Sequence, residues 1–147
     1  MRSALQKLTQ NGIQVSKELW VRFGENNSPS DNRYTWVFPG GKVCGYYEGY
    51  ISKASEEGDL LLVKLIDFEK DTRYICFVNR FVLKQLELVE SEVLSEKGFK
   101  TGFKMCLLYH GKENRKNKTF HRIEVLYDPD DTDSRLVKQE DNDDIDL

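Results

Sequence analysis

The stretch Tyr46-Tyr47-Glu48-Gly49-Tyr50-Ile51 is rich in aromatic residues and is followed, after a polar break, by the apolar run Leu60-Leu61-Leu62-Val63-Lys64-Leu65-Ile66-Asp67. Aromatic and β-branched residues favour strands, and the Gly- and Ser-containing break favours a turn. The two runs therefore predict a β-hairpin. An aromatic strand ending in Gly-aromatic-Ile before an apolar strand that closes on Asp is typical of small, bent five-stranded barrels, which are binding modules more often than enzymes.

Further short strands are predicted where apolar and polar residues alternate along the chain. Together with the hairpin, they are expected at residues 19–23, 43–52, 60–66, 73–78, 82–89, 103–109 and 119–127. Only residues 90–97 have a helix-friendly composition, and that segment is short. The expected fold class is therefore all-β. A length of 147 residues fits one ordinary domain or two very small ones that share a core, and two small barrels would have to pack together.

Four segments are expected. Residues 1–17 form a flexible N-terminal segment, residues 18–89 a first barrel, and residues 90–127 a second unit that has fewer strands and borrows some from the first. Residues 128–147 carry nine acidic residues against Arg135 and Lys138. Such an acidic block predicts a disordered tail or linker.

The formal net charge of −3 hides a basic segment between residues 97 and 122, where eight basic residues stand against Glu113 alone. These are Lys97, Lys100, Lys104, Lys112, Arg115, Lys116, Lys118 and Arg122. A basic segment with aromatic neighbours such as Tyr109, Phe120 and Tyr127 indicates a polyanion-binding face, with phosphate contacts and base stacking. We expect DNA binding of low sequence specificity, with a dissociation constant in the micromolar range or weaker at roughly physiological salt. A lysine-rich hairpin that is merely solvated is the alternative.

The sequence offers little for catalysis or metal binding. His110 and His121 are its only histidines, and it contains no G-x-S-x-G, H-E-x-x-H or phosphate-loop motif. The three cysteines are odd in number and far apart, without a C-x-x-C pair, so reduced cysteines and neither a disulfide nor a zinc site are expected. We expect no enzyme, no cofactor, no metal and no small-molecule substrate.

The apolar runs are strand-sized, and the first residues lack a hydrophobic signal segment. An intracellular, soluble chain without membrane contact is the corresponding expectation.

Several of these stretches resemble the tandem tudor domains of DNA-damage checkpoint adaptors, which carry BRCT repeats elsewhere in their chains. The similarity lies in residues 46–51, 62–67 and 82–89 and in the link 92–101 into 103–109, and it covers about residues 19–127. The Asn- and Ser-rich loop at 24–32 fits the budding-yeast class best. The resemblance implies a nuclear module that tethers its parent protein to chromatin.

The family also implies a cage of aromatic side chains and one acidic residue, which encloses a methylated histone lysine. Carried over by position, Tyr47 matches a cage tyrosine, Asp67 falls by the acidic position, and Trp36 or Phe38 supplies the aromatic residue of the opening strand. Ile66 stands where the family places an aromatic wall, and this departure favours DNA as the ligand.

Two alternatives remain open at this stage. Ordinary barrel packing would explain the aromatic residues equally well. A protein–protein interaction barrel that recognises an acidic or methylated peptide, without binding nucleic acid, is the alternative function.

Overall fold

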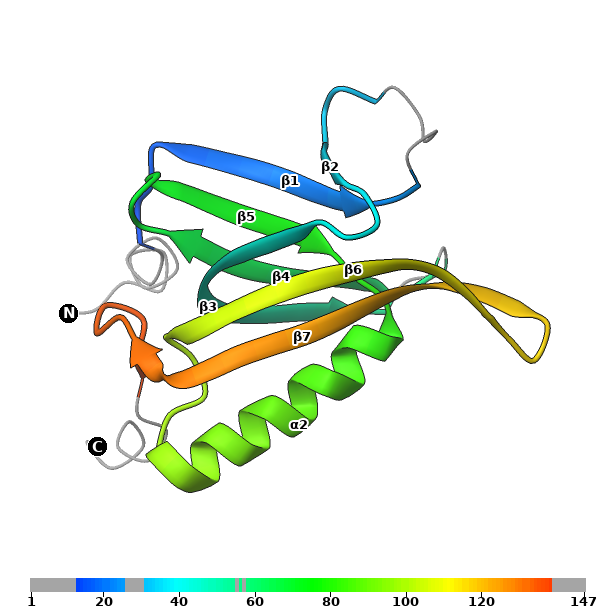
Figure 1. The fold of residues 1–147 in the computed structure, drawn as a ribbon. Coiled ribbons are helices and arrows are strands. Elements are labelled where there is room, and N and C mark those ends of the chain that lie inside the picture. Colours follow the sequence, from blue (N-terminus) through cyan, green and yellow to red (C-terminus); the bar gives the residue numbers. More distant parts are fainter. Residues whose placement is uncertain (1–12, 26–30, 55, 57, 139–147) are drawn as a thin grey trace.

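In the part of the chain that the structure describes, seven strands form one curled sheet and one helix lies against it (Figure 1). The structure is a computed structural model that describes residues 13–25, 31–54, 56 and 58–138. The strands are β1 Lys17–Phe23, β2 Thr35–Val37, β3 Lys42–Lys53, β4 Leu60–Asp67, β5 Thr72–Phe77, β6 Phe103–Arg115 and β7 Lys118–Thr132, and the helix is α2 Arg80–Lys97. The mostly β content confirms the expected class, and six of the seven expected strands are present.

The strands follow the order β2-β1-β5-β4-β3-β6-β7. Neighbours are antiparallel, except that β1 runs parallel to both β2 and β5. Strand β3 pairs with β4 on one side and with β6 on the other. The hairpin of the expected second unit therefore continues the sheet of the first.

Gly45 of β3 lies close to the backbone of β4. A Cβ atom at this position would stand 2.8 Å from the backbone oxygen of Ile66 in β4. Only glycine fits without moving one of the two strands.

The core lies between the inner face of the sheet and α2. Alternate residues of β6 (Phe103, Met105, Leu107 and Tyr109) have no exposed surface, as the period of two in a half-buried strand requires. The helix contributes Val82, Leu86, Val89 and Val93 to the same cluster.

The prediction of a strand at residues 82–89 is wrong, because these residues belong to α2. Asn79 caps the helix by accepting a hydrogen bond from the Val82 N–H at 3.2 Å, and Gly98 ends it in the left-handed conformation. The buried residues 82, 86, 89 and 93 follow the helical period, whereas Leu88 is 72% exposed. The boundary expected at residues 89 and 90 falls inside this helix.

Two side chains of the helical region attach to the outer edge of β7. The Gln85 amide donates to the Ile123 carbonyl at 2.8 Å and accepts from the Val125 N–H at 2.9 Å, and Asn79 donates to the His121 carbonyl at 2.8 Å. These bonds satisfy backbone groups that an edge strand would otherwise leave open.

The acidic segment is structured at its beginning, so a disordered tail is wrong for residues 128–138. Strand β7 continues to Thr132, the Asp133 N–H donates to the Gly102 carbonyl at 2.9 Å, and the Leu136 side chain is only 5% exposed. The rest of that tail, residues 139–147, and residues 1–12 of the N-terminal segment lie outside the described residues.

The expectation of three reduced cysteines is also wrong. Cys44 of β3 and Cys106 of β6 form a disulfide, and Cys76 is a buried free thiol. The two bonded residues are 62 positions apart in sequence but directly opposite in the β3–β6 register. Strand pairing brings them together, and their spacing in sequence does not reveal it.

Candidate nucleic-acid interface

The β6–β7 hairpin projects beyond the rest of the sheet (Figure 1). Strand β3 pairs with β6 only as far as Leu108, whereas the β6–β7 ladder continues to the pair Arg115–Lys118. At the tip, Lys116 and Asn117 have φ angles of 49° and 64°, the left-handed values that a two-residue type I′ turn needs. The hairpin end is thus a twisted two-stranded arm.

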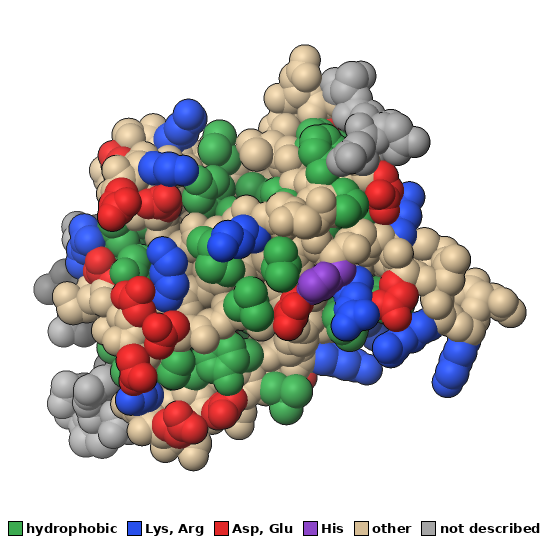
Figure 2. All heavy atoms as spheres, in the orientation of Figure 1, with side chains coloured by type: hydrophobic (Ala, Val, Ile, Leu, Met, Phe, Trp, Pro, Cys, Tyr) green, Lys and Arg blue, Asp and Glu red, His purple; other side chains and the backbone are tan. Residues whose placement is uncertain are grey.

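This arm carries five of the eight basic residues expected to bind DNA: Lys112, Arg115, Lys116, Lys118 and Arg122. Glu113 is the only acidic residue between positions 110 and 122, and its carboxylate lies 3.3 Å from Arg122 and 3.4 Å from Arg115. The side chains of Lys112, Lys116 and Lys118 are exposed and have no ion-pair partner among the described residues. Figure 2 shows several Lys and Arg side chains, in blue, toward the projecting end of the molecule.

The other three basic residues lie at the opposite end of the hairpin. Lys97 pairs with Asp130 at 2.7 Å, and Lys104 lies opposite Asp128 with its Nζ 5.1 Å from the Tyr46 ring. Lys100 lies in the link between α2 and β6. Because a strand rises about 3.3 Å per residue, Lys104 and Arg115 are separated by about 36 Å measured along β6. The basic segment is therefore divided, and the arm alone concentrates positive charge.

The aromatic residues proposed to stack on bases have different surroundings. Tyr109 is buried, and its hydroxyl lies 2.5 Å from Nδ1 of His121. Burial, with Lys112 nearby, lowers the pKa of His121. Tyr127 hydrogen-bonds Glu92 of α2 near the far end of the sheet. Phe120 packs against the Phe81 ring at 5.5 Å and is the one of the three that lies on the arm.

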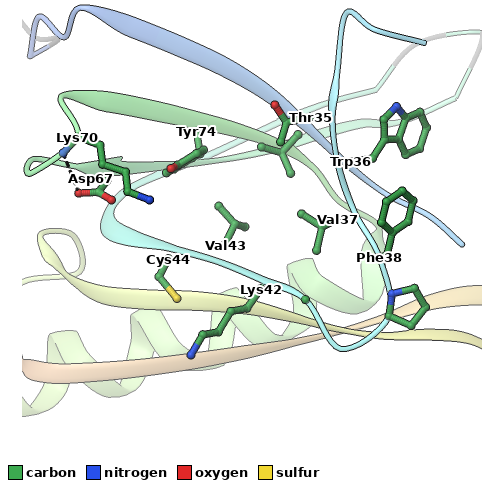
Figure 3. Close-up of a pocket in the computed structure, with 13 residues that line it drawn as sticks. Thr35, Trp36, Val37, Phe38, Lys42, Val43, Cys44, Asp67, Lys70 and Tyr74 are labelled. Carbon is green, nitrogen blue, oxygen red and sulfur yellow. Dashed lines mark hydrogen bonds between the residues drawn. The ribbon is translucent and has the colours of Figure 1, made fainter. Parts of the chain in front are cut away.

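Three of the four expected cage residues line a shallow hollow of about 660 Å³ between β2, β3 and the β4–β5 turn (Figure 3). Figure 3 shows the Trp36 and Phe38 rings on the side of β2 away from Tyr74 and Asp67. The Asp67 carboxylate accepts the N–H groups of Glu69 at 3.1 Å and Lys70 at 3.2 Å, within its own turn. The aromatic rings and the carboxylate therefore do not face one another.

Tyr47, the fourth expected cage residue, lies in the core. Its side chain is fully buried, packs on Phe103 with 5.5 Å between ring centroids, and donates to the Glu90 carboxylate at 2.6 Å. Burial and this carboxylate raise the pKa of Tyr47. The four residues consequently form no common enclosure for a methylated lysine.

Sequence reasoning missed Arg22, a residue of β1 close to the base of the arm. Its guanidinium stacks on the rings of Phe77 at 4.0 Å and Tyr34 at 4.3 Å. A charged residue within the otherwise apolar run Trp20-Val21-Arg22-Phe23 was the available signal.

Comparisons with known proteins found no matching family model, no matching characterised protein and no matching solved structure. Within the described ranges, no three His, Cys, Asp or Glu side chains are grouped so that they could hold a metal ion. The described part of the chain also has no helix long and apolar enough to cross a membrane.

Proposed function

We propose that this chain is a non-enzymatic module that tethers its parent protein to DNA through the β6–β7 arm. The observation that carries the proposal is the projecting hairpin with five basic side chains and a single carboxylate. A two-stranded β-ribbon fits the major groove of B-DNA, and Lys and Arg contacts to phosphates release counterions. Such contacts position the protein and read no sequence, which predicts low specificity and a steep dependence on salt.

The proposal extends to chromatin as the target and the nucleus as the location, on the basis of the resemblance to tandem tudor domains. We also propose that the fold is a fused pair of tudor-like units. In this arrangement the β6–β7 hairpin of the second unit uses β3 of the first unit as its third strand. The shared position of β3 between β4 and β6 supports this arrangement. A methylated histone lysine is left out of the proposal, because Tyr47 is buried and bonded to Glu90.

The decisive experiment replaces Lys112, Arg115, Lys116 and Lys118 by alanine and measures binding of a short duplex by fluorescence anisotropy at several salt concentrations. If all four residues contact phosphates, the slope of log K against log salt should become shallower by up to about 3.6, because each contact contributes about 0.9. Folding should be nearly unchanged, since exposed charges contribute little to stability.

A matched control replaces four exposed lysines outside the arm, Lys17, Lys53, Lys70 and Lys84, and so removes the same charge. Its affinity should remain close to that of the wild type. A folded arm variant with wild-type DNA affinity, or an equal loss in both variants, would contradict the proposal. Binding of an acidic peptide but of no duplex would favour the protein-interaction alternative.

A further inference from the structure

At the base of the arm lies a hollow of about 290 Å³ whose walls include Arg22, Trp36, Phe77, Asn79 and His121. His121 belongs to β7, is followed by Arg122, and pairs with Lys112 across the hairpin. The hollow therefore adjoins the base of the basic arm. The beginning of α2 borders it through Asn79, where the helix dipole is positive.

The guanidinium of Arg22 is the charged group of this hollow, and the protein leaves it incompletely satisfied. Its Nε atom is buried and has no hydrogen-bond acceptor, and its only hydrogen bond among the described residues is a long one, 3.4 Å from a terminal nitrogen to the Tyr34 hydroxyl. Buried donors without acceptors are rare in folded proteins, and a bound ion is one explanation for such a group.

Two carboxylates lie near the hollow, and only that of Asp31 is ion-paired within the described residues. Asp31 forms an ion pair with Arg33 at 2.7 Å, and Glu25 accepts the backbone N–H of Lys112 at 3.1 Å. Arg22 has no ion pair within the described residues, so its charge is available to an external anion. The two aromatic rings that stack on the guanidinium hold its plane in a fixed orientation.

His121 supplies a second polar group on the wall. When the Tyr109 hydroxyl donates to Nδ1, the neutral imidazole carries its hydrogen on Nε2, which then becomes a donor. Asn79 has both side-chain atoms engaged, with Val82 and with the His121 carbonyl, and it fixes the position of the histidine backbone.

We propose that this hollow binds one phosphate group of the nucleic acid whose adjacent phosphates lie along the β6–β7 arm. The inference rests on the proposed function, and it names Arg22 as the residue that anchors the strand at the base of the arm. Because the Nε atom of Arg22 is buried, its two terminal nitrogens are the atoms that would donate parallel hydrogen bonds to the phosphate, whereas the lysines of the arm act as point charges. Arg22 is thus expected to fix the position of the strand, while the arm supplies most of the salt dependence.

The direct test follows the Nε–Hε signals of the arginine side chains of the wild-type protein by NMR. Inorganic phosphate is added at constant ionic strength, and acetate is added in a parallel titration. We expect the Arg22 signal to shift saturably with phosphate and less with acetate, while the signal of Arg33, which is held by Asp31, stays in place. An unchanged Arg22 signal, or an equal response to acetate, would overturn the phosphate assignment.

A second measurement compares duplex binding by Arg22→Lys with that by Arg33→Lys. The Arg22→Lys variant keeps the charge and loses the planar fork, so affinity should fall on the order of tenfold, which corresponds to one charge-assisted hydrogen bond, at an unchanged salt slope. The Arg33→Lys variant should bind like the wild type. Wild-type affinity of a folded Arg22→Lys variant would also overturn the inference.

The two proposals fail in distinguishable ways. If the duplex binds through the arm and leaves the Arg22 signal unchanged, the phosphate site is refuted and the arm is not. If phosphate shifts the Arg22 signal but no duplex binds at low salt, the proposed function is refuted, and with it the nucleic acid as the source of the phosphate.

Discussion

The replacement Tyr47→Phe tests whether the aromatic strand β3 serves the core or a binding surface. It removes one oxygen atom and with it the 2.6 Å hydrogen bond to the Glu90 carboxylate of α2. A surface cage tyrosine has a hydroxyl in contact with water, so its loss would affect ligand binding and leave stability unchanged. A core tyrosine bonded to a half-buried carboxylate must affect stability.

The magnitude follows from the environment of the bond. A hydrogen bond to a charged group contributes about 1.5–3 kcal/mol to stability. Tyr47 is fully buried, but Glu90 is only partly buried and can recover some hydration once its donor is gone. We therefore expect a loss near the lower end, about 1.5 kcal/mol. With a urea m-value of about 2 kcal/mol/M, the unfolding midpoint should fall by about 0.7 M.

The assay is urea unfolding followed by circular dichroism, with Tyr50→Phe as the matched control. Tyr50 lies on the same strand and packs against the core, but its hydroxyl has no hydrogen-bond partner among the described residues. Its replacement should leave the midpoint within about 0.2 M of the wild type. Equal midpoints for Tyr47→Phe and the wild type would refute the core assignment and return Tyr47 to the surface.

High pH provides an independent check of the same bond. Burial and Glu90 raise the pKa of Tyr47, so the folded state disfavours the tyrosinate. A raised pKa contributes stability that is complete below the unfolded value, about pH 10, and is lost as the pH rises above it. The stability difference between the wild type and Tyr47→Phe should therefore narrow above about pH 10. A difference that stays constant there would contradict this reasoning.

Three further predictions concern other parts of the chain. Burial lowers the pKa of His121, so the wild type should lose stability as the pH falls below about 6.5. Thermal unfolding scans should show a smaller loss of stability for His121→Asn over that range. Parallel pH profiles of the two proteins would contradict a buried, neutral His121. The Cys44–Cys106 disulfide spans 62 residues, so its reduction should lower the free energy of unfolding by up to about 4 kcal/mol. Alkylation of both thiols under non-reducing conditions would show that the bond is absent. Gly45→Ala should cost about 2 kcal/mol or more, because its Cβ would collide with the Ile66 backbone, and an unchanged melting temperature would disprove the close approach.

Local pattern was enough to predict most strands of this protein. In β7, buried Ile123 and Val125 alternate with exposed Arg122 and Glu124, and this period of two exists before any tertiary contact is made. The basic run and the lack of recognised catalytic motifs could likewise be read from residue types alone.

The helix shows a signal that was present and misinterpreted. Residues 82, 86, 89 and 93 repeat at helical spacing between the cap Asn79 and Gly98, but the mixture of apolar and charged residues in 82–89 also suits a strand. Short runs of this kind satisfy both periods, so the caps were the better guide.

Only the tertiary structure decided which side chains meet. Both faces of β3 carry tyrosines, so the sequence could not say whether Tyr46 or Tyr47 points inward, and α2 settled this by covering the inner face and placing Glu90 against Tyr47. Strand pairing similarly joined Cys44 to Cys106 across 62 residues. The length of β6 separated Lys104 from the arm, and the curl of the sheet brought Arg22 of β1 and His121 of β7 to the wall of the same hollow. Side-chain periodicity is a local property of the chain, whereas the choice of face, the register and the neighbours depend on contacts between distant segments, and those contacts determine where a binding site can form.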